Sequence, residues 1–234
     1  MNVLMLGHSG VGKTTYVASM YGTMQSRTAG FSIKTKYAED KERLLELYKA
    51  IRHGNYPAPS HQREKYSFQL CYQGEKVLSF RWIDYRGSSF FEKSQDSDDA
   101  RILHRDLKAS DAVIAFVDCN ALASRNRYFP EIRRMGLLLA AAVQKTSRIF
   151  PLGIVLAKAD LVGKPTAELL QPLKDLLEAV QASKRITGAL IPIACGREPR
   201  NIALPLSSPS TLDFRQISPG RKSKSRPWKS SESG

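Results

Sequence analysis

The sequence predicts an α/β fold of three layers, in which helices cover both faces of a mostly parallel β-sheet. Apolar runs that are typical of buried strands alternate along the chain with segments in which apolar residues recur at helical spacing. Strands that alternate with helices pair in parallel through right-handed crossovers. The turn Gln73-Gly74-Glu75 joins two strand patterns directly, which adds one antiparallel hairpin strand to the sheet.

The first half of the chain is expected to hold three strands and two helices. A short apolar run leads into a glycine-rich turn, as a buried strand does, and a helix follows that turn. Leucines, Tyr48 and Ile51 then recur at helical spacing among charged residues, and a proline-containing loop separates this helix from the hairpin. The strands are 3–6, 65–72 and 76–84, the helices are 14–24 and 38–52, and the loop is 55–62.

The second half is expected to hold three further helices that alternate with three strands. A polar and acidic stretch precedes them. The first of these strands is apolar on both faces, as a central strand of a parallel sheet is, and the helices carry apolar residues on one side. The helices are 100–109, 131–145 and 167–182, and the strands are 112–117, 152–157 and 189–194.

Length and composition favour one domain with a tail. A chain of 234 residues holds one α/β domain, which we expect at residues 1–203. Residues 204–234 mix Ser, Pro, Lys and Arg with few apolar positions, so we expect a disordered basic tail. The formal net charge of +14 and the pI near 9.8 favour weak contact between this tail and anionic surfaces.

The sequence indicates a cytoplasmic protein without a membrane span. Only Met1 and Asn2 precede the first strand, so we expect no leader peptide. The longest apolar stretch, 136–143, is far shorter than the about 20 residues that cross a bilayer. The three cysteines are widely separated and odd in number, as expected of buried free thiols in a reducing compartment; they are Cys71, Cys119 and Cys195.

The most specific motif is a complete phosphate-binding loop, G-x-x-x-x-G-K-[ST], between the first strand and the first helix. Its glycines bring backbone N–H groups close to phosphates at a helix N-terminus. Lys13 is expected to hold the β- and γ-phosphates, and the Thr14 hydroxyl to bind Mg²⁺. His8 and Ser9 occupy free positions, where we expect them to face solvent or phosphate. The nucleotide-binding residues of this segment are Gly7, His8, Ser9, Gly10, Val11, Gly12, Lys13, Thr14 and Thr15.

A second candidate group follows the strand 76–84. Asp84 stands at the carboxyl end of this strand and Gly87 follows with the spacing D-x-x-G. In a protein with a phosphate-binding loop, this position lets the carboxylate reach Mg²⁺ through water and lets the Gly87 N–H contact the γ-phosphate. Lys13, Asp84 and Gly87 are therefore predicted to be catalytic.

A third candidate group, Lys158 and Asp160, ends the strand 152–157. The Asp160 carboxylate can accept two hydrogen bonds from the ring N–H and the amino group of guanine, while the Lys158 stem packs over the base. Adenine presents the wrong donor pattern and would leave the carboxylate unpaired. A helix-capping Asp in a turn is the alternative interpretation.

These three motifs, in this order, resemble those of the Ras-like and translation-factor-related GTPases, the TRAFAC class. The resemblance implies a Ras-like phosphate-binding-loop fold, binding of GTP and GDP with Mg²⁺, and a protein effector or regulator that the sequence does not name. It also implies that Ala194 and Cys195 lie in the loop whose backbone touches the guanine. The segment Trp82 to Gly87 looks most like that of bacterial stand-alone or double-GTPase proteins.

The chain departs from the family pattern at three places. Ala157 stands where the base-recognition motif usually begins with Asn or Thr, so guanine preference is expected to be weaker. Ser88 stands where many small GTPases have a Gln that orients the attacking water, so we expect slow hydrolysis or help from a partner. The polar tail takes the place of the helix that normally follows the last strand.

The first switch segment needs a hydroxyl ligand for Mg²⁺ in the loop before the hairpin. We expect Ser60 because Pro57-Ala58-Pro59-Ser60 directly precedes the first hairpin strand, with Thr35 as the alternative. Ser60 thus joins the predicted catalytic residues, and Thr14, Ser60 and Asp84 form the predicted metal site. Arg63 and Arg86 are more typical of surface arginines than of an arginine finger.

The sequence therefore predicts a GTP-binding switch that hydrolyses GTP slowly to GDP with Mg²⁺. An ATP-using enzyme with the same loop is one alternative, although neither an arginine-rich lid nor an acceptor-site acid is evident. A degenerate scaffold that binds nucleotide without turnover is the other, and Ser88 and the absent final helix keep it open.

Overall fold

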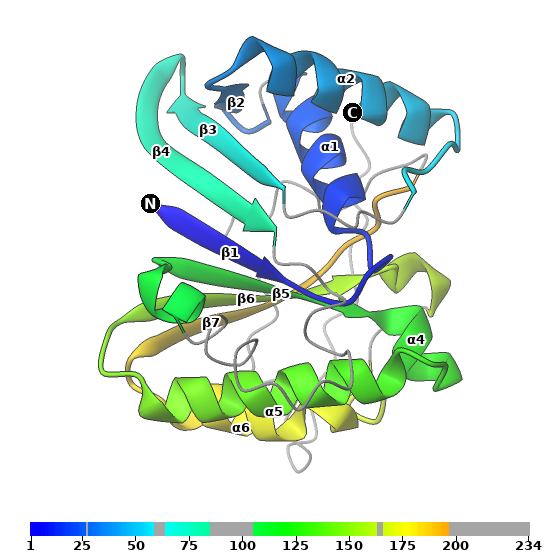
Figure 1. The fold of residues 1–234 in the computed structure, drawn as a ribbon, viewed down its shortest axis with the longest axis vertical. Coiled ribbons are helices and arrows are strands. Elements are labelled where there is room, and N and C mark those ends of the chain that lie inside the picture. The colour runs from blue at the N-terminus through cyan, green and yellow to red at the C-terminus, as the bar shows by residue number, and fades with distance from the viewer. Residues whose placement is uncertain (27, 59–63, 85–104, 163–165, 197–234) are drawn as a thin grey trace.

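The protein forms one seven-stranded sheet between two layers of helices (Figure 1). The structure is a computed structural model and describes residues 1–26, 28–58, 64–84, 105–162 and 166–196. Its strands are β1 (Asn2–Leu6), β2 (Phe31–Thr35), β3 (Lys65–Tyr72), β4 (Glu75–Asp84), β5 (Ala112–Asp118), β6 (Phe150–Ala157) and β7 (Ile186–Pro192). Its helices are α1 (Lys13–Thr23), α2 (Ala38–Arg52), α4 (Cys119–Ser124), α5 (Phe129–Lys145) and α6 (Lys174–Ala182), with short 3₁₀ turns η1 (Met24–Ser26), η3 (Ala159–Leu161) and η4 (Gln171–Leu173).

The strand order is β2-β3-β4-β1-β5-β6-β7, which places β1 in the centre. The strands β4, β1, β5, β6 and β7 pair in parallel, while β3 pairs antiparallel with both β2 and β4. Among the described strands, only β3 therefore runs against the others. The predicted fold, a mostly parallel three-layer α/β sheet with one antiparallel hairpin strand, is confirmed.

The side-chain alternation of the strands divides the core into two clusters. On β1, Val3 and Met5 point to the face that α1 and α2 cover, while Leu4 and Leu6 point to the face of α5 and α6. Because both faces are covered, each of these side chains is nearly inaccessible to water, and burial of such a side chain stabilises the fold by about 1.5–3 kcal/mol. The sheet is therefore a rigid platform for the loops at its edge.

An aromatic group fills the layer between the sheet and α1. The indole of Trp82 lies 5.6 Å from the Tyr16 ring and 5.5 Å from the Phe68 ring, measured between centroids. Tyr16 also meets Phe116 edge to face at 5.3 Å. These rings join β3, β4 and β5 to α1, which begins at Lys13, and so they fix the helix that carries the phosphate-binding loop.

Two elements were not expected from the sequence. β2 is an edge strand held by its pairing with β3, from Phe31 opposite Tyr72 to Thr35 opposite Phe68. The α2 helix separates these two strands in sequence, so no hairpin turn indicates that β2 pairs with β3. The short helix α4 is capped by Asp118, whose carboxylate accepts a hydrogen bond from the Ala121 N–H.

Two predicted boundaries are wrong. The helix expected at 167–182 begins only at Lys174, since Pro172 lacks an N–H and confines the preceding residues to turns and a 3₁₀ segment. The last strand, expected at 189–194, runs from Ile186 to Pro192, so it begins three residues earlier and ends two residues earlier than expected. Of the helix expected at 100–109, the described part, residues 105–109, is helical.

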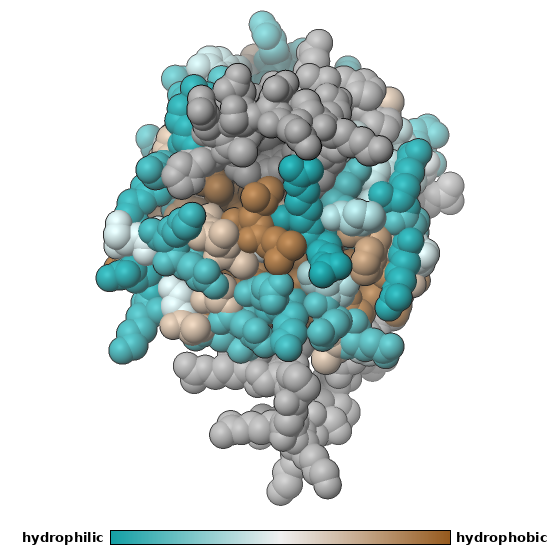
Figure 2. Space-filling view, turned by 60° about the horizontal axis from the view of Figure 1, so that its bottom comes forward, coloured by the Kyte–Doolittle hydropathy of each residue, from teal (hydrophilic) through white to brown (hydrophobic). Residues whose placement is uncertain are grey.

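One face of the molecular surface carries both hydrophilic and apolar side chains. Figure 2 shows a small central group of apolar side chains with hydrophilic side chains beside and below it. No helix in the described ranges has both the length and the apolar character needed to cross a membrane. The predicted tail, 204–234, lies outside the described residues.

Candidate nucleotide-binding site

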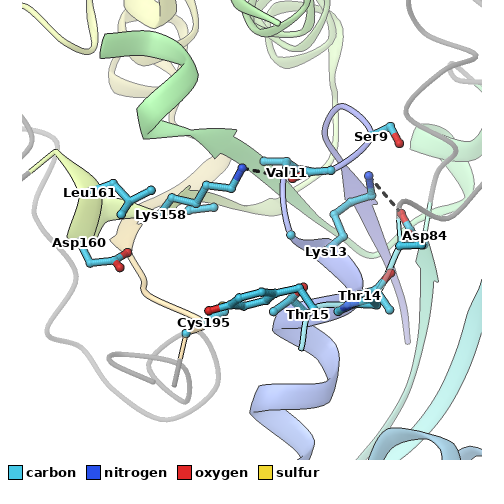
Figure 3. Close-up of a pocket in the computed structure, with 17 residues that line it drawn as sticks. Ser9, Val11, Lys13, Thr14, Thr15, Asp84, Lys158, Asp160, Leu161 and Cys195 are labelled. Atoms are coloured by element: carbon cyan, nitrogen blue, oxygen red, sulfur yellow. Dashed lines mark hydrogen bonds and ion pairs between the residues drawn. The ribbon is translucent and has the colours of Figure 1, made fainter. Parts of the chain in front are cut away.

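A pocket of about 440 Å³ opens at the carboxyl ends of the parallel strands, where α/β sheets bind ligands. Loops after β1, β4 and β6 and the segments after α2 and β7 surround it. Lys13, Thr14 and Asp84 lie on one side of this pocket, and Lys158, Asp160 and Leu161 lie on the other (Figure 3). The lining residues are Ser9 to Thr15, Tyr56, Pro57, Ala58, Asp84, Ala157, Lys158, Asp160, Leu161, Cys195 and Gly196.

The phosphate-binding loop takes the backbone shape that its glycines predict. Gly10 and Gly12 have φ angles of +77° and +108°, which side-chain-bearing residues rarely adopt. A Cβ added to Gly7 would lie 3.0 Å from the backbone of Phe116, so the loop also packs closely against β5. The Lys13 ammonium crosses the loop and donates hydrogen bonds to the carbonyls of Gly7 at 2.8 Å and His8 at 3.3 Å.

Lys13 also meets Asp84, with 3.6 Å between Nζ and Oδ1 and only 8% of each side chain exposed. Burial raises the pKa of the Asp84 carboxyl to about 6, against the opposing charge of Lys13. Burial likewise lowers the pKa of the Lys13 ammonium, while Asp84 opposes this shift. Asp84 Oδ1 has this ion pair but no hydrogen-bond partner among the described residues, and a buried carboxylate oxygen beside the Thr14 hydroxyl fits a hard divalent cation.

The opposite side of the pocket is built on the turn after β6. Lys158 adopts a left-handed backbone conformation with φ +56°, and η3 follows with Asp160 in it. The Ala159 N–H donates to the Ile193 carbonyl at 3.1 Å, which joins this turn to the end of β7. Cys195 therefore lies close to Asp160, and burial, followed by this carboxylate, raises the pKa of the Cys195 thiol.

The Lys158 ammonium has two partners in the structure. It lies 2.5 Å from Oδ2 of Asp118 and donates to the Gly10 carbonyl at 3.2 Å. Lys158 also lines the pocket. The pairing of Lys158 with Asp118 was not predicted from the sequence.

The prediction that the His8 side chain faces solvent or phosphate is wrong. His8 is only 2% exposed, and its ring stacks on Tyr128 with 4.2 Å between the centroids. The tight turn of the loop directs this side chain away from the pocket, toward the end of β5. Burial lowers the pKa of His8 to about 4, despite hydrogen bonding to Ser9 and the nearby charge of Asp118, so the imidazole is neutral at neutral pH.

Several predicted residues remain outside what the structure describes. These are Ser60 and Gly87, together with Arg63, Arg86 and Ser88. Thr35, the alternative to Ser60, belongs to the edge strand β2 and is not among the described residues that line the pocket. Ala194 is buried beside Cys195, which does line it.

Sequence reasoning missed several residues of the site. Tyr56 and Leu161 line the pocket, although each is more than half exposed, and a Cβ on Gly196 would lie 3.5 Å from the Tyr56 hydroxyl. Asp118 and Tyr128 lie behind the loops that form it. Asp118 had one available signal, because a polar residue directly after a buried parallel strand reaches the same edge as the other motifs.

A family model described as Double-GTPase 1 matches residues 4–186 of the chain. The chain belongs to the Double-GTPase 1 family. The matched range of this Double-GTPase 1 protein contains the phosphate-binding loop, Asp84 and the Lys158 turn, and it ends before Cys195. Guanine nucleotide is therefore the ligand of a domain of this family, and GTP hydrolysis is its reaction.

Solved structures of other GTP-binding proteins are similar to this Double-GTPase 1 domain. The mammalian SRP receptor is 15% identical with a TM-score of 0.45, over 83% of this chain and 92% of that chain. The FeoB G-domain from Methanococcus jannaschii is 18% identical with a TM-score of 0.43, over 87% and 91%. A GTP-binding protein from Sulfolobus solfataricus in complex with GDP is 16% identical with a TM-score of 0.43, over 83% of this chain but 46% of that chain. Among curated proteins, none matches the sequence.

Proposed function

We propose that the protein is a Mg²⁺-dependent GTP-binding switch that hydrolyses GTP slowly and changes its loops between the GTP and GDP states. The observation that carries this proposal is the division of one pocket into a phosphate side and a base side. Lys13, Thr14 and Asp84 occupy the first, and Lys158 and Asp160 the second. A nucleotide is the ligand class that presents phosphates at one end and a hydrogen-bonding base at the other.

On the phosphate side of the pocket, the protein provides N–H donors that could bind the anionic oxygens of phosphates. The Lys13 ammonium donates to the carbonyls of Gly7 and His8, and phosphate oxygens are better acceptors for the same N–H groups. The loop glycines and the start of α1 direct backbone N–H groups toward the same place. Binding of the β- and γ-phosphates would therefore draw Lys13 away from these carbonyls.

The residues present fit Mg²⁺. The Thr14 hydroxyl would bind it directly and Asp84 would hold it through water, with Ser60 and Gly87 proposed to complete the γ-phosphate end. When bound, the cation neutralises charge that develops on the phosphate oxygens. Release of Asp84 from Lys13 would free the carboxylate for this role.

On the base side, Asp160 would accept two hydrogen bonds from guanine. The Lys158 stem, Ala194 and Cys195 would enclose the same base. Slow turnover is supported by Ser88, which stands in the sequence where many small GTPases have a Gln that orients the attacking water. We further propose a cytoplasmic location, an unidentified protein effector and weak contact of the basic tail with anionic surfaces.

The test is a substitution of Asp160 that should change which nucleotide base the protein prefers. Xanthine carries a carbonyl where guanine carries its amino donor, and the amide N–H of Asp160→Asn can meet that carbonyl. We expect the parent to bind GTP more tightly than ATP or XTP, and the variant to lose GTP affinity and gain XTP affinity by tenfold or more, since each unpaired polar contact costs about 1–3 kcal/mol.

Competition binding with the three nucleotides measures the exchange, and Asp175→Asn on the exposed start of α6 is the matched control. Equal GTP and ATP affinities in the parent would favour the ATP-using alternative. GTP binding without any turnover in the presence of Mg²⁺ would favour the scaffold.

A further inference from the structure

We propose that Asp118 is a positioning residue for the nucleotide site, because its buried carboxylate holds Lys158 against the phosphate-binding loop. The inference rests on the proposed function and adds a residue from β5 to the site. It follows from a chain of contacts that runs from the end of β5 through Lys158 to Gly10.

The Asp118 carboxylate is fixed from behind. It is the last residue of β5 and the N-cap of α4, and its Oδ1 accepts the Ala121 N–H at 3.0 Å. Only 4% of the side chain is exposed. Its second oxygen, Oδ2, is thereby directed at the Lys158 ammonium at 2.5 Å, where it accepts a charge-assisted hydrogen bond.

Through Lys158, the Asp118 carboxylate is connected to the phosphate-binding loop. The same ammonium donates to the Gly10 carbonyl, in the middle of the phosphate-binding loop, at 3.2 Å. The preceding residue, Ala157, has no polar side chain that would add a second link. Two residues later comes Asp160, so the position of Lys158 also sets where the base-recognition carboxylate lies.

His8 and Tyr128 close off the remaining side of Asp118. His8 Nε2 lies 3.7 Å from Oδ2, and the ring stacks nearly parallel on Tyr128, at an interplanar angle of 9°. Because His8 Nδ1 lies 2.7 Å from the Ser9 carbonyl, Nδ1 carries the proton and Nε2 has none to offer. The imidazole therefore lies beside the carboxylate without competing for it, which leaves Lys158 as its cationic hydrogen-bond partner among the described residues.

Capping of α4 is the purely structural role that the experiment must separate from positioning. Asp118→Asn makes this separation, because Asn caps helices about as well as Asp but carries no charge for Lys158. The thermal midpoint without nucleotide reports on capping. The release rate of a fluorescent nucleotide and the ratio of guanine to adenine affinity report on positioning.

The experiment is a double-mutant cycle of Asp118→Asn and Lys158→Met in the full chain. The probe is whichever of mant-GDP and mant-ADP the parent holds more tightly. We expect each single variant to release it at least tenfold faster, and the double variant to release it no faster than Lys158→Met alone. Asp118→Asn is also expected to reduce the GDP-to-ADP affinity ratio, with the nucleotide-free thermal midpoint near that of the parent.

Multiplicative effects in the double variant would overturn the inference, since Asp118 would then act independently of Lys158. An unchanged release rate in Asp118→Asn, or an effect confined to the thermal midpoint, would overturn it as well. A parent that prefers mant-ADP would contradict the guanine specificity of the proposed function. The same cycle, run with mant-ADP, would still decide whether Asp118 acts through Lys158.

Discussion

At the scale of single residues, the side chains of the site make contacts with one another that a nucleotide would replace. Lys13 donates to two carbonyls of its own loop and pairs with Asp84, and only 8% of each of these two side chains is exposed. A buried ammonium without partners would be costly, so these contacts keep the loop folded before phosphates arrive. The same contacts explain why the pKa of Asp84 rises only to about 6 although burial drives it upward.

Replacement of Asp84 by Asn should separate nucleotide binding from turnover. The amide keeps the size of the side chain but removes the charge that we assign to Mg²⁺. We expect GDP affinity close to that of the parent and Mg²⁺-dependent GTP turnover at least about 100-fold slower, since metal stabilisation of phosphoryl transfer contributes several kcal/mol. Single-turnover hydrolysis beside GDP calorimetry measures both, and turnover at the parent rate would remove Asp84 from the mechanism.

His8 should make the stability of the protein dependent on pH. Its pKa falls from 6.5 to about 4 in the fold, so the folded state binds fewer protons than the unfolded chain between these values. The stabilisation is present above pH 6.5 and is lost as the pH falls toward 4. Between about pH 7.5 and about pH 5, the linkage relation gives a loss of about 2 kcal/mol.

His8→Phe keeps a ring that can stack on Tyr128 but does not titrate. We expect the free energy of unfolding of this variant to fall less on acidification than that of the parent, by about the same 2 kcal/mol. Asp84 contributes with the opposite sign, since its raised pKa costs stability as the pH rises, but it does so equally in both proteins. Urea unfolding at the two pH values measures the difference, and parallel profiles would show that His8 is not held neutral.

The phosphate-binding residues could be predicted because the motif specifies backbone shape and charge locally. Gly10, Gly12 and Lys13 behave as their spacing indicates. The environment of His8 could not be predicted, because the ring is buried by Tyr128 and Asp118, which are more than 100 residues away in sequence. The pairing of Lys158 with Asp118 could not be predicted for a similar reason, because it depends on where the neighbouring strands β5 and β6 end.

At the scale of elements, the packing of α1 on α2 depends on a glycine. A Cβ added to Gly22 would lie 2.2 Å from the Tyr48 ring, so the two helices approach as closely as they do only because that Cβ is missing. Gly22→Ala should therefore destabilise the fold by about 1–3 kcal/mol through overpacking.

Gly22→Ala should stabilise the fold, and no longer destabilise it, when the Tyr48 ring is absent. In a Tyr48→Ala background, the methyl group that Gly22→Ala adds meets no aromatic ring. The higher helix propensity of alanine should then stabilise the fold by up to about 1 kcal/mol. Thermal or urea unfolding of the four proteins measures the reversal. Destabilisation of equal size in both backgrounds would mean that the contact with Tyr48 is not the cause.

Elements with their own periodicity were predictable, and elements defined by a neighbour were not. Apolar residues at helical spacing predicted α5, and a continuous apolar run predicted β5. The bounds of both elements lie within a few residues of the prediction. β2 has five residues, and its pairing with β3 defines it, so its pattern alone is too short to identify it. Pro172 did carry a signal that the predicted helix 167–182 overlooked.

At the scale of the whole molecule, the strand order decides which motifs meet. Because β1 lies between β4 and β5, with β6 beyond, the carboxyl ends of all four strands share one edge. Motifs separated by more than 140 residues, at Lys13 and Lys158, thus line one pocket. The sequence predicted this meeting because parallel strands with crossovers admit few other arrangements.

The basic tail should be dispensable for the nucleotide site. Deletion of residues 205–234 is expected to leave GDP affinity unchanged, since each described pocket residue lies before residue 197. Binding to anionic vesicles should weaken and lose its salt dependence. Calorimetry and vesicle sedimentation measure the two effects, and a large fall in the thermal midpoint would instead indicate that the tail packs on the domain.

The buried Trp82 gives the molecule an optical reporter of its own. It is one of two tryptophans, and the other, Trp228, belongs to the tail. Its indole is 0% exposed, it contacts Tyr16 three residues after Lys13, and it precedes Asp84 by two positions on β4. After replacement of Trp228 by Phe, the intrinsic fluorescence would come from one indole in an apolar layer beneath the phosphates. Nucleotide arrival and departure could then be followed in real time without an attached dye.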